Sequence, residues 1–502
     1  MFDRRSFISH SAAIAAAMAA LRDSPLRAEE PKKQDKTPSL ADTVRVAVIG
    51  TGGRGGSHIS QFNGKHGCEI LTLCDVDPGR AASSSKSVEK KRGIAPTLVQ
   101  DMRKILDDKS IDVVSFATPN HWHALGAIWA MQAGKHVYVE KPATHNVHEG
   151  RAMIAAARKY KRMCQVGTQS RSNTGMRQSI AYMHDGMLGK IRQAYATCYK
   201  RRGSIGKVKG PKPVPKGVDY DLWCGPARML PIVREKFHYD WHWFYEYGNG
   251  DLGNQGVHEM DKARWGLNKK EMPKSVVSIG GRFGYVDDGE TANTQLCVFD
   301  YGDTELVFEV RGLPSGDPYP GKLGGGKVGS NFVGNIWYGE KGIVVCPGYN
   351  KGVVLAPDLS VVKEFSGGSD DDHFKNFIAA VRSGKHTDLN CDVEEGHLSA
   401  ALCHLANISV RLGKQTPLAE VKEIAGSKET GEALKRMVTH VEDNLANVED
   451  KELLKTLLKI PCLVGPLLNI DTKTERFTGS NDKANAMLTR EYRKGFEVSD
   501  KV

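Results

Sequence analysis

The chain has 502 residues, of which 40% are hydrophobic and 26% are charged, and these proportions predict a globular protein with more than one domain. No run of apolar residues approaches the ~20 needed to span a bilayer, so no stable membrane insertion is expected. The formal net charge is +11. No stacking aromatic residues alternate with the basic ones, so nucleic acid is not expected as a partner. The ten cysteines show no Cys-x-x-Cys pair and no regular spacing, which is typical of scattered buried thiols.

The first thirty residues carry the features of an export signal. Arg4 and Arg5 precede a mildly apolar run over residues 12–21, and Ala28 provides a small residue for cleavage. This arrangement resembles a twin-arginine signal peptide, and it predicts a periplasmic or otherwise exported protein. The alternative is a frayed helix at the N-terminus of a cytosolic protein. Residues 31–43 are charged and contain prolines, so we expect a linker there.

A predicted strand, a glycine-rich turn and a predicted helix follow the linker. Residues 44–49 are apolar and β-branched, as in a buried strand, and the helix is expected to continue through 58–62. The turn between them is Gly50-Thr51-Gly52-Gly53-Arg54-Gly55. In this Gly-x-Gly-x-x-Gly pattern, Gly50 permits the tight turn, Gly52 lets the backbone approach a pyrophosphate, and Gly55 lets helix and strand pack closely. The pattern therefore predicts an NAD or NADP site, with the pyrophosphate on the first amides of the helix.

An acidic residue follows the second predicted strand, which covers residues 69–74. Asp75 lies about 20 residues beyond Gly55, where an acid meets the ribose hydroxyls of a bound dinucleotide. Asp75 therefore favours NAD over NADP. Arg80 would instead meet a 2′-phosphate, so NADP stays open, and Asp75 as a simple turn residue before Asp77 is the remaining alternative.

Helices and strands continue to alternate up to residue 139. The predicted elements are a helix over 101–107, a strand over 112–117, a helix over 124–133 and a strand over 136–139. This alternation argues for a parallel, doubly wound sheet, and we assign residues 44–165 to a Rossmann domain. Ligands bind beyond the carboxyl ends of such strands. Two polar segments lie there, Thr118-Pro119-Asn120 with His123 close behind, and Glu140-Lys141-Pro142.

Together with the glycine-rich turn, these two segments are similar to the glucose–fructose oxidoreductase/inositol dehydrogenase (Gfo/Idh/MocA) family, over residues 44 to about 410. The resemblance implies a nicotinamide cofactor, held by the turn and by Thr118, Pro119, Asn120, His123, Glu140 and Lys141. It also implies that Lys141 touches the reacting hydroxyl beside the nicotinamide. An ammonium at that place would orient a sugar hydroxyl and polarise its oxygen as charge develops.

A second motif lies at residues 248–261, and from residue 255 onward it predicts a helix. Asn254, His258 and Asp261 are then spaced i, i+4 and i+7, on one helical face. His258 is the natural general base, because its unperturbed pKa of ~6.5 lets it accept a hydroxyl proton near neutral pH. Asp261 would orient the imidazole or pair with a neighbouring cation, and these residues with Lys141 are the expected substrate contacts.

The family usually carries an aspartate where this chain has Asn254. An amide binds a hydroxyl by hydrogen bonding but cannot take its proton. We therefore expect His258 to act as the main base and Asn254 to position the substrate, with Asp251 as an alternative acid. The alternative is that His258 has no catalytic role and is a hydrogen-bonded histidine of the core.

No metal site is expected. His121 and His123, and more loosely His238 and His242, have ligand-like spacing, but no carboxylate or cysteine joins them at a suitable interval. A basic stretch rich in glycine and proline covers residues 200–217. It is interpreted either as a solvated surface loop or as a cationic lid over an acidic or phosphorylated substrate.

Beyond the Rossmann domain, the pattern changes to clustered strands. Strands are predicted at 191–199, 275–282, 294–299, 305–310, 335–338, 342–345 and 353–355, and helices at 370–383 and 392–412. This suits the open, mostly antiparallel sheet that the resemblance implies. The predicted fold class is thus α/β, with a Rossmann domain followed by an α+β substrate and oligomerisation domain over 166–502. Residues 418–460 predict a charged helical insertion without an assigned role, and a homodimer or homotetramer is expected.

The function predicted from these features is hydride transfer between a sugar, glycoside or cyclitol hydroxyl and NAD or NADP. Because free nicotinamide cofactor is scarce outside the cytoplasm, an exported enzyme would keep its cofactor tightly bound. One alternative is redox-neutral: transient oxidation would acidify a neighbouring C–H bond and permit glycoside cleavage or epimerisation. Another is a nucleotide-binding sensor without catalysis, which the missing family aspartate would permit.

Overall fold

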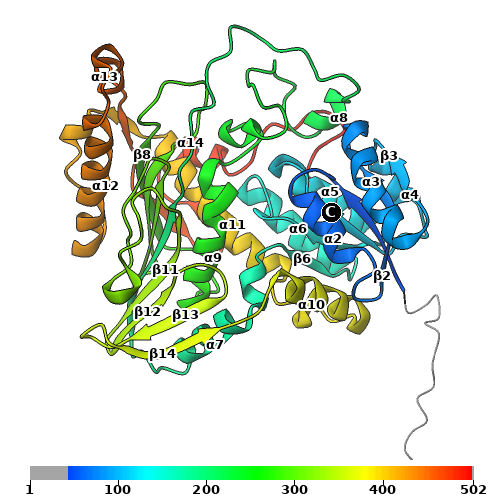
Figure 1. The fold of residues 1–502 in the computed structure, drawn as a ribbon, viewed down its shortest axis with the longest axis horizontal. Helices are drawn as coiled ribbons and strands as arrows, with labels where there is room; N and C mark the ends of the chain where they lie inside the picture. The colour runs from blue at the N-terminus through cyan, green and yellow to red at the C-terminus, as the bar shows by residue number, and fades with distance from the viewer. Residues whose placement is uncertain (1–42, 500–501) are drawn as a thin grey trace, which may run out of the picture. The chain divides into compact units, whose positions relative to one another are not determined.

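The computed structural model describes residues 43–499 and residue 502. The predicted export signal and nearly all of the predicted linker lie outside these residues. The chain from Val44 onward forms one compact unit, which contains two large β-sheets (Figure 1). No helix in the described part combines the length and the apolar character needed to cross a membrane. All ten cysteines are buried free thiols, as their irregular spacing predicts.

The first sheet has six parallel strands in the order β3-β2-β1-β4-β5-β6. The strands are β1 (Val44–Ile49), β2 (Cys68–Cys74), β3 (Thr97–Val99), β4 (Val113–Phe116), β5 (His136–Val139) and β6 (Cys164–Val166). The helices are α2 (Arg54–Phe62), α3 (Pro78–Arg92), α4 (Arg103–Asp107), α5 (His123–Gln132) and α6 (Val147–Lys159). The strand order reverses between β1 and β4, as in doubly wound dinucleotide-binding folds. The predicted Rossmann architecture is confirmed.

Helix α3 is the largest element of this domain that the sequence pattern does not predict. Only Ala81, Ser85 and Val88 are buried in it, so it lacks the wide apolar stripe by which helices are recognised. Its ends are nevertheless encoded locally. The Asp77 carboxylate accepts the Gly79 N–H at the start, and Gly93 ends the helix in the left-handed region with φ of 78°.

The second sheet is mostly antiparallel, and its main path runs β14-β13-β12-β11-β7-β10-β9-β8-β16-β15. Its strands are β7 (Ile191–Tyr199), β8 (Ser275–Gly281), β9 (Thr294–Asp300), β10 (Glu305–Arg311), β11 (Phe332–Gly339), β12 (Gly342–Cys346), β13 (Lys351–Leu355), β14 (Val361–Ser366), β15 (Lys414–Thr416), β16 (Cys462–Val464), β17 (Leu468–Asp471) and β18 (Arg476–Phe477). All the predicted strands are present, and the predicted mostly antiparallel sheet is confirmed. The edge strand β14 is not predicted from the sequence. Most of its side chains are exposed, so apolar and polar residues do not alternate along it.

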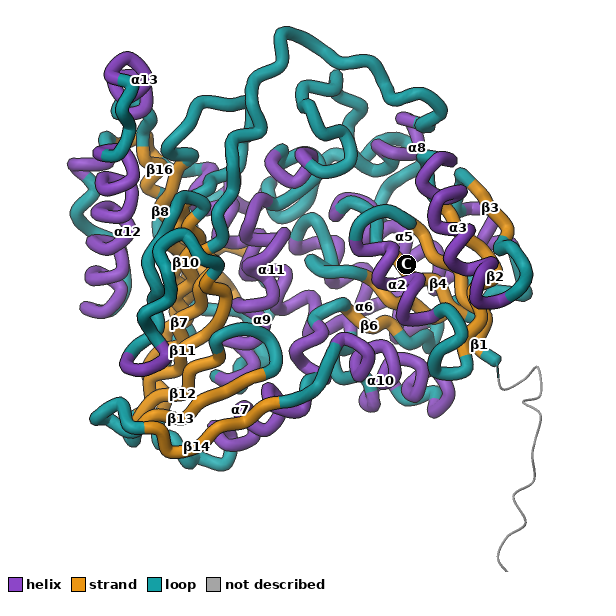
Figure 2. The backbone as a smooth tube through the Cα atoms, in the orientation of Figure 1, coloured by secondary structure: helices purple, strands orange, loops and turns teal. Residues whose placement is uncertain are grey.

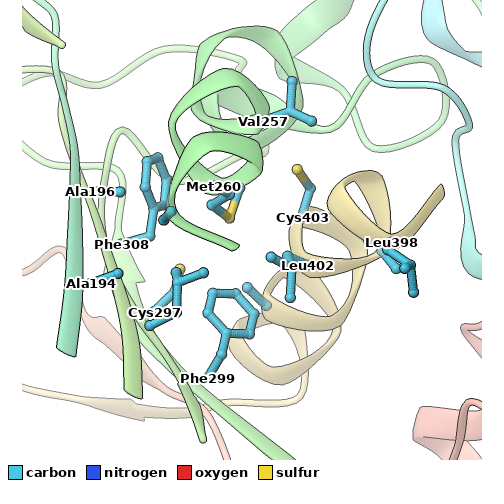
Figure 3. Packing of buried hydrophobic residues seen from close by; sticks show 14 of the residues in the cluster. Ala194, Ala196, Val257, Met260, Cys297, Phe299, Phe308, Leu398, Leu402 and Cys403 are labelled. Atoms are coloured by element: carbon cyan, nitrogen blue, oxygen red, sulfur yellow. The ribbon is translucent and has the colours of Figure 1, made fainter. Parts of the chain in front are cut away.

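Helices cover both faces of the second sheet. On one face, α9 (Val257–Gly266) and α11 (Val393–Arg411) pack on strand residues such as Phe299 and Phe308, and Met260 and Leu402 point toward these rings (Figure 3). Burial of each such large apolar side chain stabilises the fold by ~1.5–3 kcal/mol relative to exposure. On the other face, α12 (Lys428–Ala446) packs through residues such as Leu434 and Met437, with α13 (Lys451–Leu457) beside it (Figure 1). The helical segment predicted at 418–460 is therefore the cover of this outer face.

Segments from late in the chain complete the core of the first domain. In α10 (Asp370–Ser383), Phe374 stacks on Tyr138 of β5 with ring centroids 4.4 Å apart. On the opposite side, Phe496 and Val498 join the apolar cluster of β4, α5 and α6. The predicted domain boundary at 165/166 falls inside β6, and the Rossmann core extends well beyond the contiguous segment that the sequence suggests.

Candidate active site

A cavity of about 510 Å³ lies beyond the carboxyl ends of the parallel strands, between the first sheet and α9. The sequence-predicted residues that line it are Gly50, Gly52, Gly53, Arg54, Asp75, Arg80, Thr118, Pro119, Asn120, His123, Glu140, Lys141, Asn254 and His258. The structure thus brings together two motifs more than a hundred residues apart. Gly55 and Asp261 do not line the cavity.

The glycine-rich turn has the geometry that its sequence predicts. Gly50 has φ of +80°, and a Cβ there would lie 2.6 Å from the Ala117 carbonyl oxygen. A Cβ on Gly55 would lie 1.9 Å from the Gly50 oxygen, so Gly55 acts through close packing rather than through ligand contact. Helix α2 begins at Arg54, and its first amides therefore adjoin the cavity wall formed by the turn. Such a helix start is a ready site for a phosphate group.

Asp75 and Arg80 occupy the end of the cavity beyond β2. The Asp75 carboxylate accepts the Thr51 N–H at 2.8 Å and the Thr51 hydroxyl at 3.0 Å on one oxygen, and the Asp77 N–H at 3.0 Å on the other. A carboxylate has about four acceptor positions, so one remains for a ligand hydroxyl. The Arg80 guanidinium covers Gly52, since a Cβ on that glycine would lie 1.8 Å from an Arg80 nitrogen.

Glu140 links the Lys141 segment to the helix that follows the glycine-rich turn. Its buried carboxylate accepts Arg54 Nε at 2.8 Å, contacts His58 Nε2 at 3.1 Å and accepts the Gln169 amide at 3.1 Å. Burial opposes the charge, but Arg54 and His58 hold the pKa of Glu140 well below its usual range. The second oxygen accepts the Lys141 N–H at 3.1 Å. Glu140 thus holds Lys141 and the glycine-rich turn in place, a role that the sequence prediction of a cofactor contact does not include.

Lys141, Asn254 and His258 come together in the lining of the cavity. The Lys141 ammonium donates to the main-chain carbonyl of Asn254. Burial lowers the pKa of Lys141, and burial together with the Lys141 charge lowers the pKa of His258 well below 6.5. His258 is therefore a neutral imidazole at neutral pH. Its Nδ1 is buried and has no hydrogen-bond partner within the described chain.

The backbone around Asn254 departs from the predicted regular helix. Residues Leu252–Gly256 form a π-helical turn, η5, that runs into α9. Such wide turns occur frequently at functional sites. The Asn254 amide donates to Asp251 Oδ1 at 3.4 Å. Asp251, the alternative acid, is itself buried and paired with Arg202 at 2.7 Å outside the cavity lining, so it does not replace the family aspartate.

The structure does not place Asp261 in the lining of the cavity, where a substrate contact is expected. Its buried carboxylate receives a bidentate contact from Arg171, at 2.8 to 3.0 Å, and the Ser399 hydroxyl at 2.7 Å. Residues three apart on an α-helix point about 60° apart and are offset by about 4.5 Å along the axis. This offset carries Asp261 away from His258 and toward Arg171, which also contacts Glu395 at 3.0 Å.

His121 and His123 form hydrogen bonds with main-chain carbonyl groups. His121 contacts the Trp223 carbonyl at 2.9 Å, and His123 contacts the Pro142 carbonyl at 2.7 Å and the Thr118 carbonyl at 2.9 Å. Burial lowers the pKa of His121 to about 3. Their contacts fix the loop that carries Thr118. Across the residues that the structure describes, no group of three or more histidine, cysteine or acidic side chains is arranged to hold a metal ion.

The basic stretch at 200–217 is a largely exposed loop (Figure 2). It is anchored by the pairs Arg202–Asp251 and Lys212–Glu235. Its described residues do not line the cavity, which favours the surface-loop interpretation over a lid.

Two models of one protein family match this chain. Residues 44–168 match the model described as oxidoreductase family, NAD-binding Rossmann fold, and residues 182–319 match the model of its C-terminal alpha/beta domain. The chain belongs to the Gfo/Idh/MocA oxidoreductase family. The family resemblance noted in the sequence is thereby confirmed.

Relatives and solved structures similar to this Gfo/Idh/MocA protein have carbohydrate-related names. A glycosyl hydrolase family 109 protein from Shewanella pealeana is 34% identical over 175 residues, which cover 32% of this chain and 38% of that protein. The match thus spans less than half of that curated relative. Levoglucosan dehydrogenase, solved with NADH and levoglucosan, has a TM-score of 0.53 at 18% identity, covering 72% of this chain and 97% of that one. The WlbA dehydrogenase from Bordetella pertussis, solved with NADH and UDP-GlcNAcA, has a TM-score of 0.51 at 20% identity, covering 72% and 96%. The two structures show a shared fold.

The cavity of this Gfo/Idh/MocA chain fits a nicotinamide dinucleotide. Buried polar atoms without a partner among the described residues gather in residues that line it: Arg54 Nη2, Thr118 Oγ1, Ser170 Oγ, Asn173 Oδ1 and His258 Nδ1. Buried polar groups are rarely left unpaired, so their convergence indicates polar ligands. The glycine-rich turn and Thr118 would hold the cofactor, and the wall with His258 and Asn173 is left for a second polar molecule.

Several cavity residues are missed by the sequence analysis. Gln169 and Ser170 lie in η3 (Gln169–Ser172), and Asn173 caps α7 (Thr174–His184). The Asn173 amide nitrogen donates to the Tyr349 carbonyl at 3.1 Å, which leaves its oxygen as an acceptor for a ligand O–H or N–H. These residues follow β6 directly. Prediction of that short strand would have placed them at the ligand edge of the sheet.

Proposed function

We propose that the protein transfers a hydride between a carbinol of a sugar, glycoside or cyclitol and a nicotinamide cofactor, NAD in preference to NADP. The observation that carries the proposal is that Lys141 and His258 line the same cavity as the glycine-rich turn. The sugar-related names of the relatives support the substrate class.

Each residue then has a defined part in the reaction. The bound cofactor would supply the hydride acceptor. The Lys141 ammonium orients the substrate oxygen and stabilises the charge that develops on it. The neutral His258 imidazole accepts the hydroxyl proton. Asn254 and Asn173 supply hydrogen bonds but take no proton, since both are amides.

A redox-neutral reaction is the second candidate function. The relative named as a glycosyl hydrolase family 109 protein favours it, because that protein is 34% identical to this chain over 175 residues. Transient oxidation of the carbinol, for which the bound cofactor would supply the hydride acceptor, would acidify the adjacent C–H bond and permit loss of the aglycone, with water adding in its place. The cofactor would then return to its starting state in each cycle.

We further propose that residues 1–30 direct export by the twin-arginine route and that the cofactor is retained in the mature protein. Assembly as a homodimer or homotetramer stays a prediction. Fractionation of cells expressing the full chain, with Arg4 and Arg5 replaced by Lys as the control, tests the export. Light scattering of the purified protein tests the assembly.

One experiment distinguishes the candidate reactions. The purified protein is examined for bound nicotinamide by absorbance and then mixed with sugars and aryl glycosides without added cofactor. Accumulation of reduced cofactor supports the dehydrogenase, and release of aglycone without net reduction supports the glycosidase. Bound cofactor with no change for any sugar would contradict both and favour a sensor.

Cofactor preference follows from Asp75 and Arg80. Replacing Asp75 with Ala is expected to weaken NADH binding ~10–100-fold, because hydrogen bonds to a carboxylate contribute ~1.5–3 kcal/mol. Replacing Arg80 with Ala should leave NADH affinity within about threefold, since NAD carries no 2′-phosphate. Titration of NADH and NADPH fluorescence with each variant measures both effects. If the unaltered protein binds NADPH more tightly than NADH and the Arg80 variant loses this preference, the preferred cofactor is NADP and the assignment of NAD is reversed.

The pH dependence of hydride transfer reports the two catalytic groups. The pKa of His258 is lowered, so its imidazole stays neutral through pH 6.5 and the rate should fall only well below that value. The pKa of Lys141 is also lowered, so the alkaline loss of its charge should begin below pH 10.5. Single-turnover rates between about pH 4 and about pH 11 reveal both limbs. An acid limb centred at or above pH 6.5 would contradict the role of His258.

A further inference from the structure

One wall of the cavity comes from the far C-terminal end of the chain. Phe496 lines the cavity beside Trp122 and Trp129 and is 8% exposed. Its ring centroid lies 5.7 Å from that of Trp122, at an interplanar angle of 84°, and 6.1 Å from that of Trp129. The family models match no residue beyond 319, so this wall lies outside the part of the chain that they describe.

The tail that carries Phe496 is tied down along its length. The Leu488 carbonyl accepts the His148 N–H of α6 at 2.9 Å, and the Tyr492 hydroxyl donates to Glu149 of the same helix at 3.2 Å. Arg490 donates to the Glu246 carbonyl at 3.0 Å and pairs with its carboxylate. The tail is therefore attached both to the Rossmann domain and to the loop that precedes η5.

A tight turn then directs Phe496 toward the cavity. Its N–H donates to the Arg493 carbonyl at 2.9 Å, and Gly495, the third residue of the turn, has φ of 85°. That conformation favours glycine. Arg493 also pairs with Asp221 of α8 (Tyr220–Cys224), and its guanidinium lies 5.2 Å from the Phe496 ring centroid. The turn is thus held from both sides.

Phe496 lies near the segment that follows β3: it shares an apolar cluster with Met102, and Arg103 feels the charge of Asp221, the partner of Arg493. Met102 lines the cavity together with Asp75 and Gln100, which follow β2 and β3. In a doubly wound fold the acid after the second strand meets the ribose hydroxyls, so the part of the cavity around Asp75 takes the adenosine half of a dinucleotide. A flat base gains ~1–3 kcal/mol from contact with an aromatic side chain, and Phe496 with the two tryptophans offers such a surface.

We propose that residues 488–496 form a C-terminal strap whose Phe496 binds the adenosine half of the cofactor and slows its release. This rests on the proposed function, because it takes the cavity to be a nicotinamide cofactor site. The strap would account for retention of the cofactor through contacts made by this chain's own C-terminus.

The test uses the full-length protein loaded with NADH, which is then displaced by excess NAD in a stopped-flow fluorimeter. Phe496→Ala is expected to raise the NADH dissociation rate ~10-fold or more, through loss of the aromatic contact. Arg493→Ala, which frees the turn from Asp221, should also raise it, by about threefold or more. Val498→Ala is the matched control: Val498 is buried in the same tail but does not line the cavity. It should change the rate less than about twofold.

Each outcome has a defined meaning. Bound NADH with unchanged dissociation in both the Phe496 and the Arg493 variants would overturn the strap and leave the proposed function standing. Failure of the unaltered protein to bind NADH would overturn the proposed function, and the strap with it. Equal acceleration in all three variants would assign the effect to tail stability and overturn the role of Phe496. If Phe496→Ala does not fold, Phe496→Leu keeps apolar volume and should still release NADH faster, and an unchanged rate for it would count against the strap.

Discussion

Replacing His258 with Ala is expected to lower turnover ~10²–10⁴-fold, the range that a positioned general base contributes. The imidazole is neutral, its Nδ1 has no partner among the described residues, and it lines the same cavity as Lys141. NADH affinity should change little, because the glycine-rich turn and Asp75 provide the expected dinucleotide contacts and are left unchanged. Steady-state rates with a responsive sugar, together with NADH titration, measure the two effects separately.

His184→Ala provides a matched control for this experiment. His184 contacts the Trp265 carbonyl at 2.9 Å, near the end of the helix that carries His258, and it lies outside the cavity lining. The control should keep turnover near that of the unaltered protein, which shows that a general disturbance of α9 is not responsible. Unchanged turnover in the His258 variant would remove that residue from the mechanism.

Replacing Asp261 with Ala is expected to affect stability rather than chemistry. The substitution leaves Arg171 and Arg264 in a buried site with Glu395 as their remaining acidic partner. Breaking a buried ion pair by removing one partner costs about 3–5 kcal/mol. The free energy of unfolding in urea should therefore fall by that amount. The kcat of the folded fraction should stay within about threefold, since no transition-state contact is lost.

Asp303→Ala is the control for the Asp261 substitution. Asp303 pairs with Lys269 at 2.6 Å, but its side chain is 63% exposed. Removal of an exposed ion pair costs only about 0–1 kcal/mol. A loss of kcat in the Asp261 variant as large as that of the His258 variant, without a change in stability, would return Asp261 to the substrate site.

The contrast between His258 and Asp261 shows that helical spacing alone does not decide which residues of a helix line a site. Both residues lie on one helix within about one turn of each other, and a periodicity argument treats them alike. The tertiary structure separates them, because Arg171 and Ser399 surround Asp261 while His258 faces the cavity. A buried charge is stable only beside a fixed partner of opposite charge. The partner of Asp261 is Arg171, which lies ninety residues away in sequence.

Glu140 illustrates a second limit. Its place at the end of a strand, beside Lys141, is readable from the sequence. Its side-chain contacts are not, because Arg54 and His58 reach it from α2 and Gln169 reaches it from η3. Its role as the support of Lys141 therefore emerges only when those elements are assembled.

The sequence by itself determined the dinucleotide-binding fold and the wall formed by the glycine-rich turn. Those features depend on local physics: β-branched runs form buried strands, and only glycine fits the turn at Gly50 and the close packing at Gly55. It also identified Lys141 and His258, because each lies in a short motif with a chemical meaning. The tertiary structure alone decided the neutral state of His258, the partner of Asp261 and the entry of Phe496 into the cavity wall. Each of these depends on burial or on contacts between residues far apart along the chain, and no local pattern encodes them.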